Sequence, residues 1–267
     1  MPPTGASSRT LSFRRALAAE WTKLITVRST LWTALCGLVV SLGLGVGLSM
    51  AMTASYSSMS SADKASFDPT SHALSGLNLS TLAFAVLGVM AITSEYSTGM
   101  IRTSLAAMPR RVHLLGAKAL VLAAVVLVIG EIISFGSFFT SQAVFSAEDI
   151  ETTLGAPGVL RAVASSGALM ALIALLGLAV GTLVRHVAGA ITIMLGVLFV
   201  APVITMFVPG TAGESIGKFL PTGLTEAVVS VVPAERYLTP GTGFLIYCLY
   251  ALALLVFAAY RLRKTDA

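Results

Sequence analysis

Six long apolar runs constrain the fold of this 267-residue chain more than any other feature. A helix of about 20 apolar residues crosses the hydrocarbon of a bilayer, and each run is long enough to do so. Only 11% of the residues are charged and 56% are hydrophobic, whereas about a quarter of the residues of a soluble domain are charged. We therefore predict an all-α membrane protein in which residues 29–267 form a single domain, with spans near 31–52, 77–93, 114–135, 163–184, 191–208 and 244–260.

The basic residues predict how these spans are oriented. If the chain begins inside, 13 of the 17 lysines and arginines fall in inner segments, and the outer ones are Lys64, Arg161, Lys218 and Arg236. Inner loops of membrane proteins carry such an excess of basic residues. We expect both termini to be cytoplasmic, and we expect the net charge of +5 to reflect topology and contact with membrane lipid, with no nucleic-acid partner.

The N-terminal segment precedes the first span. Residues 1–11 are rich in Pro, Ser, Gly and Thr and are predicted to be disordered. Residues 12–28 have the pattern of an amphipathic helix lying in the inner interface. Glu20 projects onto the edge of its apolar stripe, which is made by Phe13, Leu17, Trp21 and Leu24. This helix serves either as an anchor alone or as a connecting helix that also contacts a cytosolic partner.

Two connections between spans have distinctive sequences. Arg185 and His186 separate the fourth and fifth apolar runs, which together are too long for one crossing and therefore predict a tight helical hairpin. In the last outer segment, residues 220–232 are apolar and lie between prolines. They predict a re-entrant or interfacial helix before the sixth span.

The chain lacks the motifs of an enzyme. Its Gly217-Lys218-Phe219 sequence has neither the earlier glycine nor the following hydroxyl residue of a phosphate loop. The three histidines fall on different sides of the membrane, so we expect no metal centre. We expect neither catalysis nor a bound cofactor on this chain.

Glu131 is the acidic residue within an apolar run. It lies about 25 Å from Leu114 along a helix, in the outer leaflet. A carboxylate there needs a partner or a function. The two readings are a structural pair with Arg161, which lies at a similar depth, and a place on a substrate path.

Small residues recur at close-packing spacing in two spans. The first span contains Gly37, Ser41 and Gly45 in one register and Gly43 and Gly47 in another, and the fourth contains Gly177 and Gly181. Such stripes let helices approach closely. They serve either packing within one subunit or, for the first span, a dimer interface.

Motifs at three places resemble those of ATP-binding-cassette type 2 permeases, including bacterial half-size exporters. The family typically has Glu-x-x-x-Gly at the end of the second span, then a Leu, a Pro, and a Gly and Lys that open the third. Here these are Glu95, Gly99, Leu105, Pro109, Gly116 and Lys118. Residues 20–24, Glu-Trp-Thr-Lys-Leu, are similar to the connecting-helix signature. The resemblance covers nearly the whole chain.

The resemblance implies a permease subunit of an exporter in the bacterial cytoplasmic membrane, with a cytosolic coupling helix between the second and third spans. That helix would seat on a separate ATPase subunit, which binds ATP and Mg²⁺, and a second permease copy or a related permease would complete the path. The expected ATPase contacts are Glu20, Glu95, Tyr96, Gly99, Arg102, Pro109, Arg110 and Arg111. The alternatives are a basic loop that only anchors to anionic lipid, a channel or carrier that is not coupled to ATP, and a scaffold that recruits a cytosolic protein.

Overall fold

The structure, a computed structural model, describes residues 5–26, 28–65, 67–100, 111–209, 211–232 and 237–264. Within these ranges the secondary structure is helical, without strands. In this described part of the chain, six helical segments are long and apolar enough to cross a membrane, which confirms the predicted number of spans. They are Leu35–Tyr56, Leu77–Ser97, Arg111–Glu148, Val159–Val184, Val187–Met206 and Pro240–Lys264.

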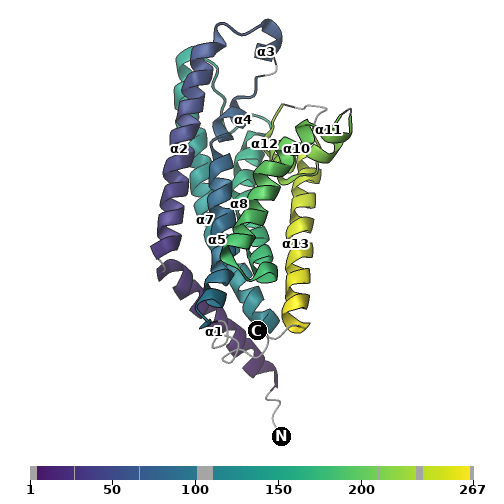
Figure 1. Cartoon of the computed structure of the whole chain (residues 1–267). Helices are drawn as coiled ribbons and strands as arrows, with labels where there is room; N and C mark the ends of the chain where they lie inside the picture. Colours follow the sequence, from purple (N-terminus) through teal and green to yellow (C-terminus); the bar gives the residue numbers. More distant parts are fainter. Residues whose placement is uncertain are drawn as a thin grey trace.

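The helices follow one another in the order shown in Figure 1. The first half contains α1 (Gly5–Thr26), α2 (Arg28–Tyr56), α3 (Ser61–Ala65), α4 (Pro69–Leu74), α5 (Leu77–Ser97) and α7 (Arg111–Phe145), which continues into η1 (Ser146–Glu148). The second half contains α8 (Val159–Val184), α9 (Val187–Leu195), η2 (Gly196–Val200), α10 (Ala201–Met206), α11 (Thr211–Gly217), α12 (Pro221–Val229) and α13 (Pro240–Lys264).

Helix α8 forms the centre of the bundle. In its most apolar stretch 72% of the residues are buried, against 22% in those of α2 and α13. The reason is that α5, α7 and α13 all pack around α8. Helices α2 and α13 lie on opposite flanks in Figure 1. Their exposed faces carry large apolar side chains, such as Trp32, Val39, Leu252 and Val256, as expected for surfaces that face lipid.

Two glycines allow α5 and α8 to cross closely. A Cβ atom added to Gly88 would lie 1.9 Å from the carbonyl oxygen of Ala174, and one added to Gly177 would lie 2.2 Å from that of Ala85. Any side chain at either position would therefore clash with the neighbouring backbone. The stripe of the fourth span thus serves packing within the chain.

The two small-residue registers of α2 have different surroundings. Gly37 and Gly45 face α5 and α7, where an added Cβ would contact Ser80 and Ser141. Gly43 and Gly47 have nothing within 4 Å of such an atom. The first register therefore packs inside the chain and the second lies on its surface.

The fifth span begins at a sharp turn and contains a local irregularity. Arg185 ends α8 with a left-handed φ of 59°, and His186 caps α9 by accepting a hydrogen bond from Gly189 N. This is the predicted hairpin. Within the span, η2 is a π-helical turn just before Pro202, which has no N–H and would crowd the carbonyl of an α-helical turn.

At one end of the bundle, the segment after α12 is held by two charged side chains. Asp68 Oδ2 accepts hydrogen bonds from Val231 N and Val232 N, and Oδ1 of the same carboxylate caps α4. Arg161 donates to the carbonyl oxygens of Val228 and Ser230. Helix α12, Pro221–Val229, is therefore tied at its end to α4 and α8.

The other end, which we call the basic end, is formed by α1, the start of α7 and the last turn of α13 (Figure 1). Helix α1 packs against α7 there, and the ring of Phe13 meets that of His113 at 5.9 Å. The helix begins at Gly5, seven residues before the predicted start at residue 12.

Candidate functional site

Four charged side chains from three helices meet at the basic end. Lys118 Nζ on α7 lies 2.7 Å from Glu20 Oε2 on α1 and 2.7 Å from Glu95 Oε1 on α5. Lys23 Nζ, also on α1, lies 2.8 Å from Glu20 Oε1 and 2.9 Å from the same oxygen of Glu95. We call Glu20, Lys23, Glu95 and Lys118 the charged tetrad.

The sequence places the tetrad at helix positions that face one another. Glu20 and Lys23 are one turn apart on α1, and Ala16 shares their buried face. Trp21, which belongs to the apolar stripe predicted to face the inner interface, is 48% exposed. The face of α1 that packs into the bundle therefore includes Glu20, which was predicted at the edge of the apolar stripe, because two lysines compensate its carboxylate.

Burial makes the balance of charge in the tetrad important. Glu20, Glu95 and Lys118 are each at most 6% exposed, and only Lys23 is open to one side. Two positive and two negative charges sum to zero, so each ion has compensating partners. An uncompensated ion at this depth would cost several kcal/mol, which is about the free energy of removing a charged group from water into a protein interior.

The protonation of Lys23 follows from this environment. Burial alone would lower its pKa, but the hydrogen bonds and attraction from Glu20 and Glu95 outweigh that effect and raise the pKa. Lys23 therefore remains an ammonium group under physiological conditions. Of the carboxylate oxygens, Glu95 Oε2 is enclosed and accepts no hydrogen bond from the described part of the chain.

A groove of about 250 Å³ opens beside the tetrad, between α1 and α5. We call it the tetrad groove. Its polar side is formed by the tetrad with Ser94 and Thr98. The apolar side chains that line it come from the same two helices and the residues just after α5: Leu24, Leu87, Met90, Ala91 and Met100.

The other predicted contact residues lie around the tetrad or beyond the described ranges. The ring of Tyr96 lies 5.5 Å from the guanidinium carbon of Arg185, and Arg111 Nη1 donates to Leu262 O. Gly99 ends α5 with a left-handed φ of 71°, a conformation that glycine adopts readily. Arg102, Pro109 and Arg110, and with them most of the predicted coupling helix, lie outside the described residues.

Glu131 does not belong to the tetrad. Its carboxyl group lies over Gly167 of α8, where an added Cβ would be 2.5 Å from Glu131 Cδ. Its Oε2 is buried without a hydrogen-bond partner among the described residues. Arg161 instead donates to carbonyls at the end of α12, so the predicted pair between these two residues does not form here.

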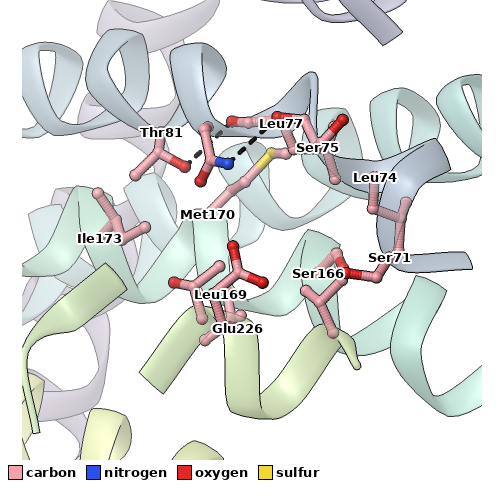
Figure 2. A pocket seen from close by; sticks show the side chains of 13 residues that line it. Ser71, Leu74, Ser75, Leu77, Thr81, Ser166, Leu169, Met170, Ile173 and Glu226 are labelled. Carbon is pink, nitrogen blue, oxygen red and sulfur yellow. Dashed lines mark hydrogen bonds between the residues drawn. The ribbon is translucent and has the colours of Figure 1, made fainter. Parts of the chain in front are cut away.

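A second, smaller cavity lies at the opposite end, among α4, α5, α8 and α12 (Figure 2). Figure 2 shows Thr81, Met170, Ser166 and Glu226 around it. Its volume of about 20 Å³ is enough for roughly one water molecule. It is too small for an organic ligand. Two further grooves, of about 240 and 290 Å³, are each lined by one charged side chain, Glu226 and Arg161. The tetrad groove is lined by four charged side chains, so it forms the stronger candidate site.

Sequence reasoning named Glu20 and Glu95 but not their mutual partners. The missed signal was Lys118, a lysine inside the apolar run 114–135, where an ammonium group calls for an acid. Lys23, three residues after Glu20, was a second signal.

Comparisons with known proteins do not identify the chain. No protein-family model matches it, and no curated protein matches it at a significant level.

Proposed function

We propose that this protein is the permease subunit of an ATP-binding-cassette exporter, driven by ATP that a separate ATPase subunit hydrolyses. The observation that supports this most is the charged tetrad. The segment 101–110 joins α5 to α7, and Glu95 and Lys118 tie these two helices together near its ends. Glu20 and Lys23 then fasten both helices to α1.

This arrangement suits the transmission of force. A push on segment 101–110 would be carried into α5 and α7 together, since these two helices are linked by an ion pair of 2.7 Å. Helix α1 would move with them, and α5 would pass the motion to the central α8 through its close crossing at Gly88. Rigid-body displacement of packed helices is a common form of conformational switching.

The proposal assigns different roles to the predicted contact residues. Glu20 and Glu95 are buried against lysines, so we propose that they position the connector. Arg102, Arg110 and Arg111, together with Pro109, would supply the surface that the ATPase meets. Two permease copies, or two related chains, would form the substrate path, and hydrolysis would belong to the partner.

The experiment is reconstitution of the full-length chain with an ATPase encoded beside its gene. We expect a stable complex whose vanadate-sensitive ATPase activity drops when Arg110→Glu or Pro109→Gly alters the connector. Lys64→Glu, which changes a charge at the opposite end of the bundle, should leave that activity unchanged. Activity that is unaffected by both connector variants, or failure to form any complex, would leave an uncoupled channel, a carrier or a scaffold as the better reading.

The orientation is tested separately. We propose that the basic end faces the cytoplasm. In a chain with Cys36 and Cys248 replaced by serine, a membrane-impermeant thiol reagent added to intact cells should label Lys64→Cys and not Arg14→Cys. The reverse labelling would overturn the topology, and the ATPase could then not reach the connector.

A further inference from the structure

We propose that the tetrad groove binds the headgroup of an ethanolamine phospholipid, with the start of an acyl chain along its apolar wall. The tetrad would hold both charges of the zwitterion. This inference requires only that the chain lies in a membrane, and it stands or falls independently of the ATPase partner.

The groove has the two-sided chemistry of a lipid site. Leu24, Leu87 and Ala91 form an apolar wall, and the charged tetrad forms the other wall. Its volume of about 250 Å³ is slightly below the range of about 300–1,000 Å³ that is usual for sites of drug-sized ligands. A headgroup and the first carbons of one chain are the part of a lipid that suits this space.

The tetrad retains one donor and one acceptor for a ligand. Lys23 is an ammonium with three N–H bonds, and two of them go to Glu20 and Glu95. Its side chain is 38% exposed, so the third can reach a lipid phosphate. Glu95 is 6% exposed, and its Oε2 accepts no hydrogen bond from the residues that the structure describes.

A primary ammonium group supplies what Glu95 lacks. Glu95 is one of the residues that line the groove, and its Oε2 has no donor among the described residues. The ammonium of ethanolamine can then donate a charge-assisted hydrogen bond to it. Because Lys23 and Glu95 are already joined by a 2.9 Å ion pair, the phosphate and the ammonium would each lie beside the charge of opposite sign.

Charge balance distinguishes this lipid from others. The tetrad is neutral, and so is an ethanolamine phospholipid, so the occupied groove would remain neutral. An anionic phosphatidylglycerol headgroup would add an uncompensated negative charge next to two carboxylates. A choline headgroup has the right charges, but its trimethylammonium carries no N–H and cannot satisfy Glu95 Oε2.

The position of the groove also fits a headgroup. The two tryptophans of the chain, Trp21 and Trp32, lie on α1 and at the start of α2, at the same end of the bundle. They are 48% and 63% exposed. Tryptophan is enriched where the membrane meets water, at the level of the headgroups.

The test measures lipid binding to the purified full-length chain, in detergent, by native mass spectrometry. The probes are phosphatidylethanolamine, phosphatidylcholine and phosphatidylglycerol with identical chains, and glycerophosphoethanolamine, which has no chains. We expect phosphatidylethanolamine to bind about tenfold more tightly than phosphatidylcholine, as one hydrogen bond to a charged group allows. Equal binding of these two lipids, or preference for phosphatidylglycerol, would overturn the proposal. So would equally tight binding of the chainless headgroup, since the apolar wall would then contribute nothing.

A matched pair of variants locates the site. Ala91→Phe fills the apolar wall without changing a tetrad residue, and it should abolish the preference for ethanolamine. Ile132→Phe, at a 60% exposed position of α7 away from the groove, should retain it. If Ala91→Phe does not fold, Thr98→Trp obstructs the groove from an exposed position. A preference that persists in a folded groove variant would place the lipid elsewhere and refute the assignment.

Discussion

The charged tetrad makes a sharp prediction about Lys118. In Lys118→Met, the apolar stem of the side chain is largely kept and the ammonium group is lost. The change removes two ion pairs of 2.7 Å and leaves Glu20 Oε2 without its partner. Two buried carboxylates would then share Lys23 alone, with a net charge of −1.

The expected cost follows from burial. Lys118 is 4% exposed, and Glu20 and Glu95 are 4% and 6% exposed, so water cannot replace the missing ammonium. Removing one partner of a buried ion pair costs about 3–5 kcal/mol. That corresponds to a fall of roughly two to four powers of ten in the ratio of folded to unfolded protein.

A second substitution tests whether the charge balance is the cause. Lys118→Met combined with Glu20→Gln leaves Lys23 facing Glu95, a neutral pair 2.9 Å apart. The double variant should recover about 1–3 kcal/mol relative to the sum of the single changes, as coupled neighbours do.

Reversible unfolding in mixed micelles provides the free energies of unfolding. Arg14→Met, on the exposed side of α1, is the matched control and should change stability by no more than about 0.5 kcal/mol. The reasoning is refuted if Lys118→Met is as stable as this control. It is also refuted if the double variant is no more stable than additive single effects require.

Three further predictions concern packing, pH and the end of α12. Gly177→Ala should lower the free energy of unfolding by about 1–3 kcal/mol through overpacking, because its Cβ would lie 2.2 Å from a backbone oxygen. Gly47→Ala, with open space around the added Cβ, should be neutral or slightly stabilising in the same unfolding assay. Burial lowers the pKa of His72 despite the opposing attraction of Asp68. Below about pH 6.5, the unfolded chain therefore takes up a proton that the folded chain does not. The free energy of unfolding should fall as the pH decreases through that range, and His72→Asn should weaken this pH dependence. Asp68→Ala removes the acceptor of the Val231 and Val232 amides and should lower the free energy of unfolding by about 1.5–3 kcal/mol. Faster proteolysis near residue 231 is a second readout. An unchanged melting temperature would contradict this prediction.

Hydrophobicity and length were sufficient to predict the six spans, because a helix that crosses lipid must be long and apolar throughout. The turn at Arg185 and His186 was predictable for the same reason: two runs of that combined length cannot form one crossing. The π-helical turn before Pro202 was not predicted, since it is a local response of the backbone to a proline inside a span.

The arrangement of the site was harder to predict. Periodicity placed Glu20 at the edge of the apolar stripe of α1, but the lysines of two helices stabilise this carboxylate in the interior. Pairing between α1, α5 and α7 depends on how the helices assemble, and the sequence spacing between Glu20 and Lys118 carries no information about it. Depth alone suggested Arg161 for Glu131, whereas Arg161 meets the carbonyls at the end of α12.

The neutrality of the tetrad also has a consequence for how the sequence can change over evolution. A lineage that loses Lys118 would retain two acids and one base, and selection would favour the loss of the acid at position 20 or 95. Conversely, replacement of Glu20 would relax the requirement for one of the lysines. Positions 20, 23, 95 and 118 should therefore change in pairs that keep the sum of their charges at zero, even though they are separated by up to 98 residues.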